Sequence, residues 1–186
     1  MNIENQEIPK KSFKEFVKEN KVIIISFLTL LVLGLLVFIG FNEYTKKKNL
    51  LVSENFNKAK ILIDRNNNEE ALKILEKIVY KNNKFYSPLS LNIILEKKLI
   101  KDKNKIISYF DEIISNSSVD LETKNLFIFK KTIFLGGDIE ENELLKNLKP
   151  IIQSNSVWKN AVSNYIQKYY LSKKEYNKAK EFKSNN

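Results

Sequence analysis

Apolar residues are distributed along this chain in two different ways. Positions 22–41 form twenty consecutive uncharged residues, of which only Ser26 and Thr29 are mildly polar. At about 1.5 Å per residue, a helix of this length spans roughly 30 Å, the thickness of a bilayer's hydrocarbon core. A globular helix in a small protein rarely stays apolar on every face for so long, because its outer face meets water. The segment therefore predicts a transmembrane helix.

The same segment lacks the features of a cleavable signal peptide, which has a shorter apolar core followed by a small-x-small cleavage site. Here the run ends in Ile39-Gly40-Phe41-Asn42-Glu43-Tyr44, where no such site occurs. We therefore expect a retained signal anchor. It divides the chain into a tail (1–21), the anchor (22–41) and a domain (42–186).

Beyond the anchor, apolar residues recur with helical period, and no stretch alternates as a half-buried strand does. The predicted fold is all-α, with a first helix that continues the anchor outward. Gly136-Gly137-Asp138 predicts the end of the fifth helix, and Pro150 predicts a kink or an end late in the sixth. The eight apolar stripes cover residues 52–63, 71–79, 91–99, 106–114, 126–133, 144–151, 158–169 and 176–182.

The polar turns between these stripes recur at a regular interval. Turns rich in lysine or asparagine precede Ala71, Ile107 and Ala179, which are separated by 36 and 72 residues. Tetratricopeptide repeats have a period of about 34 residues. They often have a small residue where the second helix crosses the first, and this chain resembles them in having Ala71 and Ala179 at that place. The sequence therefore predicts a tetratricopeptide-like array of about four helical hairpins, although the usual turn glycine is absent.

Stacked hairpins form a concave surface that can bind segments of partner proteins. Aromatic side chains often supply much of the binding energy at such surfaces. The C-terminal candidates are Trp158, Tyr165, Tyr169 and Tyr170. Because the first three share the apolar stripe of their helix, we expect them in the core and expect Tyr170 to be the exposed member.

The residue types leave little chemistry for an enzyme. The chain has no cysteine and no histidine, which excludes a thiolate nucleophile, a disulfide framework and the usual zinc sites. With four glycines, it also lacks a phosphate-binding loop. The acidic pairs Asp111-Glu112 and Glu140-Glu141 do not form shared sites by themselves, because adjacent helical residues point in different directions. We predict no catalytic, cofactor-binding or metal-binding residue, no cofactor and no small-molecule substrate.

The net charge of +10 comes almost entirely from lysine, since Arg65 is the only arginine. Nucleic-acid-binding proteins commonly use arginine forks for phosphates and bases. Here the lysines are interleaved with 22 acidic residues, as on a solvated surface, and the abundance of Lys, Asn and Ile is typical of a genome of low G+C content. We expect no nucleic-acid partner, and a basic membrane-bound nucleic-acid binder is the less favoured alternative.

Charge alone does not orient the anchor, because five lysines lie on each side of it. A short tail inside is favoured, since long soluble domains are translocated with little regard to their charge. The lysines before the anchor are Lys10, Lys11, Lys14, Lys18 and Lys21, and those after it are Lys46, Lys47, Lys48, Lys58 and Lys60.

The order of these parts resembles the YfgM-like family of bacterial inner-membrane proteins. The similar segments are Phe13-Lys-Glu-Phe16-Val-Lys-Glu-Asn-Lys21-Val, Leu121-Glu-Thr-Lys-Asn-Leu126 and Asn155-Ser-Val-Trp158-Lys159, in which Val157 replaces a common proline. The resemblance implies a single-pass inner-membrane protein with a cytoplasmic tail and a periplasmic tetratricopeptide-like domain. It also implies an accessory role beside the Sec translocon and periplasmic chaperones. The alternative is a scaffold for another envelope assembly, such as division or outer-membrane biogenesis.

Overall fold

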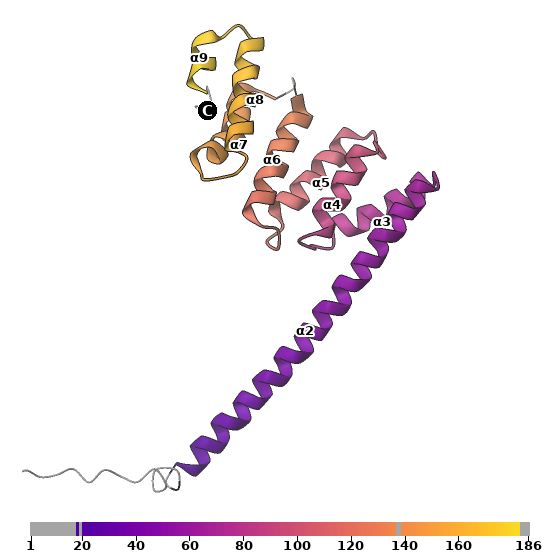
Figure 1. The fold of residues 1–186 in the computed structure, drawn as a ribbon, viewed down its shortest axis with the longest axis vertical. Helices are drawn as coiled ribbons and strands as arrows, with labels where there is room; N and C mark the ends of the chain where they lie inside the picture. Colours follow the sequence, from indigo (N-terminus) through magenta and orange to yellow (C-terminus); the bar gives the residue numbers. More distant parts are fainter. Residues whose placement is uncertain (1–17, 19, 137–138, 183–186) are drawn as a thin grey trace, which may run out of the picture. The chain divides into compact units, whose positions relative to one another are not determined.

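The computed structural model describes residues 18, 20–136 and 139–182. This part of the chain is all-helical and contains no strand, which confirms the predicted fold class. Its helices, shown in Figure 1, are α2 (Lys21–Asp64), α3 (Asn68–Val79), α4 (Tyr86–Glu96), α5 (Lys103–Ser115), α6 (Leu121–Leu135), α7 (Glu141–Gln153), α8 (Lys159–Ser172) and α9 (Tyr176–Glu181).

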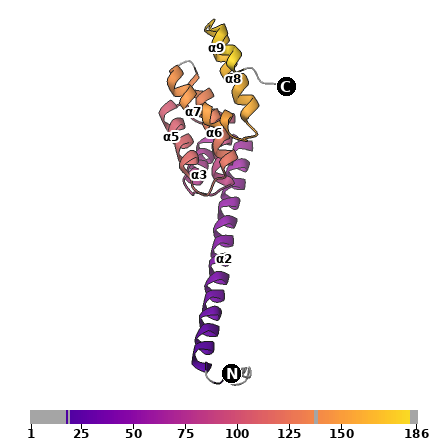
Figure 2. The same cartoon turned by 90° about the vertical axis from the view of Figure 1, so that its left-hand side faces the viewer.

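The chain divides into two compact units, of which the first is Met1–Lys48. Its described helical part is the beginning of α2, drawn in indigo in Figure 2. An 18-residue window of this helix has a mean hydropathy of 3.2, and none of it is buried. The helix is therefore long and apolar enough to span a membrane. Most of the predicted tail, including Phe13 and Phe16, lies outside the described residues, as do Lys10, Lys11 and Lys14.

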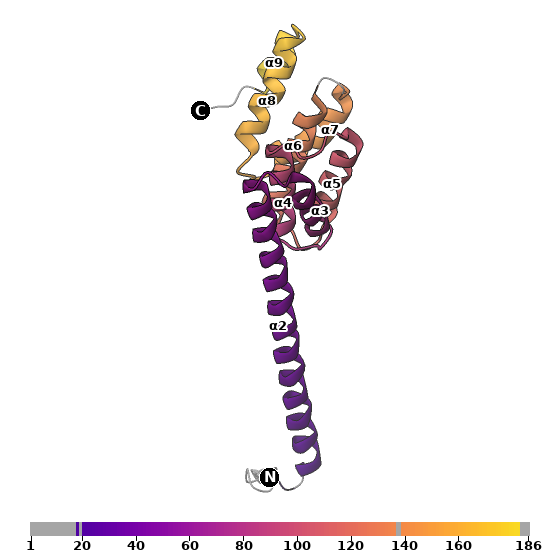
Figure 3. The same cartoon turned by 90° about the vertical axis from the view of Figure 1, so that its right-hand side faces the viewer.

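The second unit, Asn49–Asn186, contains the end of α2 and the seven helices that follow. From α3 to α9, each helix packs against the next one in the chain, and α3 also contacts α5 (Figure 3). Alternate helices, α3, α5, α7 and α9, begin at residues 68, 103, 141 and 176, at intervals of 35, 38 and 35 residues. The interval is close to the one predicted from the turns.

The fourth residue of each of these alternate helices is buried. These residues are Ala71, Ile106, Leu144 and Ala179, with exposed fractions of 0, 6, 0 and 2%. Ile107, which the sequence pattern aligned with Ala71, is only partly buried. The predicted register in α5 was therefore wrong by one residue, because the turns before the helices differ in length.

The domain has two hydrophobic clusters that share α6. The first extends from the end of α2 to α6 and includes Phe56, Leu75 and Phe127. The second includes Leu148 and Ile166 and extends from α6 to α9. Along α6 only Leu121 and Ile133 are exposed, because this helix contributes side chains to both clusters.

Polar side chains and one glycine define several helix ends. The Asp102 and Asp120 carboxylates accept hydrogen bonds from the Lys105 and Thr123 amides at 3.1 and 2.9 Å, and so cap α5 and α6. Two hydrogen bonds from Thr123, through its amide and its hydroxyl, lower the pKa of Asp120. Gly136 ends α6 with a φ of 57°, as predicted. Gly137 and Asp138 lie outside the described residues.

Two prolines lie within helices. α4 begins at Tyr86, so that Ser87-Pro88 lies in its first turn. Backbone amides of the first turn have no partner within the helix, so the missing N–H of Pro88 costs little. Pro150 was predicted to give a kink or an end, and α7 continues past it to end three residues later, at Gln153. Pro150 is exposed, and water can satisfy the carbonyl left without an amide partner.

The C-terminal aromatic residues differ from the prediction at one position. Trp158, Tyr165 and Tyr169 are partly buried against the second cluster, as expected. Tyr170, expected to be exposed, is only 1% exposed and stacks on Phe182 with 5.8 Å between ring centroids. That prediction was wrong because α7 and α9 cover this face of α8.

The Tyr170 hydroxyl is paired as well as buried. It donates a hydrogen bond to Glu141 Oε1 at 2.9 Å, and the same oxygen accepts one from Lys178 Nζ at 2.7 Å. Burial, followed by the hydrogen bond to Glu141, raises the pKa of Tyr170 to about 12. Hydrogen bonds from Lys178 and Tyr170 lower the pKa of Glu141. The three side chains connect α7, α8 and α9.

Replacing the buried alanine of α3 tests the packing of the hairpins. Ala71→Leu inserts three heavy atoms at a position with no exposed surface and should lower the free energy of unfolding by about 1 to 3 kcal/mol. Ala161→Leu, at an exposed position of α8, should change it by less than about 0.5 kcal/mol. Thermal unfolding of the full chain in detergent micelles, followed by circular dichroism, measures both. Equal effects would contradict the packing at Ala71.

Alkaline titration tests the buried hydroxyl of Tyr170. A phenol with a raised pKa in the folded state contributes stability that is complete below its unfolded pKa of about 10 and is lost as the pH rises towards 12. Tyr170→Phe should be less stable than wild type by about 1 kcal/mol at pH 8. This deficit should shrink by pH 11, because only the wild type loses the contribution. Unfolding temperatures of the two chains at both pH values give the comparison, with Tyr176→Phe at an exposed position of α9 as control. A deficit independent of pH would refute the assignment.

Candidate functional site: a lysine-rimmed groove

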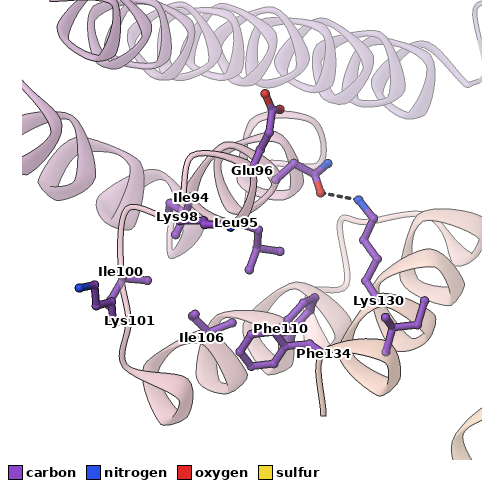
Figure 4. Close-up of a pocket in the computed structure, with 12 residues that line it drawn as sticks. Ile94, Leu95, Glu96, Lys98, Ile100, Lys101, Ile106, Phe110, Lys130 and Phe134 are labelled. Atoms are coloured by element: carbon purple, nitrogen blue, oxygen red, sulfur yellow. Dashed lines mark hydrogen bonds between the residues drawn. The ribbon is translucent and has the colours of Figure 1, made fainter. Parts of the chain in front are cut away.

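A groove of about 990 Å³ lies between α4, α5 and α6 (Figure 4). Its walls are apolar, and lysines lie at its edges. We call it the lysine-rimmed groove. The main apolar side chains that line it are Ile94 and Leu95 of α4, Ile106 and Phe110 of α5, and Ile133 and Phe134 of α6.

The turn after α4 forms one side of the groove. Lys98 has a φ of 51°, which is uncommon for a residue with a side chain. The amides of Lys98 and Leu99 then donate to the carbonyls of Leu95 and Ile94 at 3.2 and 3.0 Å, which closes the helix end. The turn that follows places Ile100 and Lys101 along the groove.

Aromatic packing forms the floor of the groove. The Phe110 ring lies 6.2 Å from the Phe127 ring and 5.9 Å from the Phe134 ring, measured between centroids. Phe110 and Phe127 are each 1% exposed, and Phe134 is partly buried. The floor is therefore part of the first hydrophobic cluster, so that α5 and α6 hold it in place.

The charged residues along the groove are mostly cationic. Lys98 and Lys101 lie on the turn, and Lys130 of α6 lies across the groove from Lys101 (Figure 4). The one carboxylate among the lining residues belongs to Glu96, which is 3.5 Å from the Lys97 ammonium. The edges thus favour an anionic group over a cation.

Lys130 differs from the other lysines of the groove because it is partly buried. Its Nζ donates to Asn92 Oδ1 at 2.7 Å and lies 5.4 Å from the Phe127 ring centroid. It forms no ion pair with any described residue, whereas the next residue, Lys131, pairs with Asp111 at 2.5 Å. Burial lowers the pKa of Lys130. A cation is therefore kept where its hydration is incomplete and no anion compensates.

The aromatic residues predicted as binding candidates, and the acidic pairs rejected as catalytic sites, lie elsewhere. Trp158, Tyr165, Tyr169 and Tyr170 pack in the second cluster and do not line the groove. The acidic pairs are divided among different partners, since Asp111 contacts Lys131 while Glu141 contacts Tyr170 and Lys178. The described residues contain no group of three or more acidic side chains that could hold a metal ion.

Two segments that carry the family resemblance lie against each other. Glu122 Oε2 accepts hydrogen bonds from the Ser156 hydroxyl at 2.8 Å and from the Val157 amide at 3.1 Å. The indole Nε1 of Trp158 donates to the backbone carbonyl of Glu122 at 3.1 Å. These contacts fix the start of α8 against the start of α6, and they give both segments a structural role.

Comparison with known proteins adds no assignment: no family model, no curated protein and no solved structure matches this chain.

Removing the charge of Lys130 tests whether the groove keeps it at a cost to stability. Lys130→Met retains an unbranched stem and removes the partly buried ammonium. We expect the unfolding temperature to stay unchanged or to rise by about 2 to 4 °C, because burial disfavours the charged form. Lys131→Met removes an ammonium that has a carboxylate partner and should lower stability by up to about 1 kcal/mol. If Lys130→Met unfolded at a much lower temperature than Lys131→Met, the Lys130 ammonium would be a stabilising group.

Proposed function

We propose that this protein is a membrane-anchored adaptor whose lysine-rimmed groove binds a segment of a partner protein. The observation that carries the proposal is the apolar groove of about 990 Å³, in a chain that also has an apolar helical segment without a buried residue. Binding sites in proteins commonly have volumes of about 300 to 1,000 Å³ and apolar walls with a few polar groups. The groove has both properties.

The helix spacing supports a tetratricopeptide-like array as the architecture of the adaptor. Alternate helices begin 35, 38 and 35 residues apart, and each buries its fourth residue. Two of these residues, Ala71 and Ala179, are small, as expected where paired helices cross. Repeat arrays of this kind expose long surfaces on which protein partners bind. In this proposal the four hairpins are the end of α2 with α3, α4 with α5, α6 with α7, and α8 with α9.

The resemblance to YfgM-like proteins supports a more specific version. In it the anchor lies in a bacterial inner membrane, the tail is cytoplasmic, and the domain is a periplasmic accessory to the Sec translocon and its chaperones. This version proposes no enzymatic activity and no nucleic-acid partner. A different envelope assembly as the partner would leave the adaptor function unchanged.

A single cysteine can test both the partner and the side of the membrane, because the natural chain has none. Ile133→Cys places a thiol at a 46% exposed position on the groove. In spheroplasts, we expect a membrane-impermeant maleimide to label this variant from outside. Coupled to a benzophenone maleimide and irradiated, the same thiol should capture a distinct protein, which mass spectrometry then identifies.

Leu171→Cys is the matched control, since Leu171 is 45% exposed on α8 and does not line the groove. Equal capture from both positions would argue against the groove as the binding surface. Labelling only after lysis would place the domain inside the cell, and a captured protein outside the translocon would direct the proposal to another assembly.

A further inference from the structure

The partly buried Lys130 ammonium determines which ligands suit the lysine-rimmed groove. Its contacts among the described residues are a neutral amide oxygen, Asn92 Oδ1 at 2.7 Å, and the face of Phe127. Neither supplies a negative charge. A carboxylate placed beside this ammonium would form a charge-assisted hydrogen bond at a site where water screens the pair poorly.

The apolar walls determine the rest of the ligand. Ile106 and Phe110 lie one helical turn apart on α5, and Ile133 on α6 remains 46% exposed. Separate apolar side chains of a ligand could therefore lie in the groove, over α5 and α6. Covering Ile133 would remove apolar surface from water, which favours binding.

The position of the other cations distinguishes a peptide from a fatty acid. Lys98 and Lys101 are exposed on the turn, on the opposite side of the groove from Lys130 (Figure 4). An acyl chain carries one carboxylate and can satisfy one side. A peptide that has acidic residues on both sides of its apolar side chains can satisfy both.

We propose that the lysine-rimmed groove recognises an acidic-apolar segment of a partner protein, with apolar side chains in the groove over α5 and α6 and a carboxylate on the Lys130 ammonium. This inference rests on the proposed adaptor function and names the chemistry of its ligand. Lys101 and Lys98 contact a second acidic residue at the other side of the groove.

Peptide binding to the full chain in detergent micelles tests this proposal. The probe is a fluorescein-labelled peptide of about nine residues, with two leucines and one phenylalanine flanked at both ends by glutamates. Fluorescence anisotropy should show binding that weakens about tenfold for Lys130→Gln, as expected for loss of a charge-assisted hydrogen bond. Lys149→Gln, which removes the same charge at an exposed position of α7, should bind as the wild type does.

Three outcomes would overturn the proposal. Equal weakening by Lys130→Gln and Lys149→Gln would show attraction to the net charge of the protein alone. If a peptide with serines in place of the apolar residues bound as tightly, attraction to the net charge of the protein would again explain the binding. If dodecanoate displaced the peptide, and bound more tightly than the peptide in a way that depends on Lys130, the ligand would be an acyl chain.

The two proposals can fail separately. If the Ile133→Cys variant captures a partner but Lys130→Gln leaves peptide binding unchanged, the adaptor function is supported and the acidic ligand is refuted. If the peptide results hold but that variant captures no protein beyond the Leu171→Cys control, the adaptor function is refuted while the selectivity of the groove remains.

Discussion

The helical domain depends on α6, whose residues other than Leu121 and Ile133 are all partly or fully buried. Helices of 11 to 15 residues, such as α4 to α8, are marginal in water by themselves, so each is stable only where an apolar face is covered. α6 directs Phe127 into the first cluster and Ile128 and Phe129 towards the second. Because α6 contributes side chains to both clusters, a change in its packing affects the helices before and after it.

Local features of the fold were predictable from the sequence, while features set by contacts between helices were not. The apolar anchor segment and the eight helical stripes correspond to the described helices, and Gly136 ends α6 as expected. The sequence did not distinguish which tyrosine of α8 is buried. Tyr169 and Tyr170 follow Ile166 by three and four residues, so both continue the apolar stripe of Val162 and Ile166. Phe182 of the C-terminal segment and Glu141 of α7 select Tyr170 for burial, and neither is local to it.

The groove could not be predicted, because its residues come from three helices and the turn between two of them. Lys130 and its partner Asn92 are 38 residues apart. In the sequence Lys130 is one of two adjacent lysines on a helix, with nothing to separate it from Lys131, which pairs with Asp111. Only the contact of Lys130 with Asn92 of α4 shows that its ammonium is partly buried without an anion. Such a placement is unfavourable for stability.

The packing of each helix mainly against the next one in the chain has a consequence for how the domain forms. Few contacts join residues far apart in sequence, and proteins with such local contacts generally fold fast. A chain synthesised from its N-terminus can then acquire structure in the order in which it appears. α3 provides a surface for α4, and each later helix packs against the one before it. Growth of this kind needs no late pairing of the two ends of the domain.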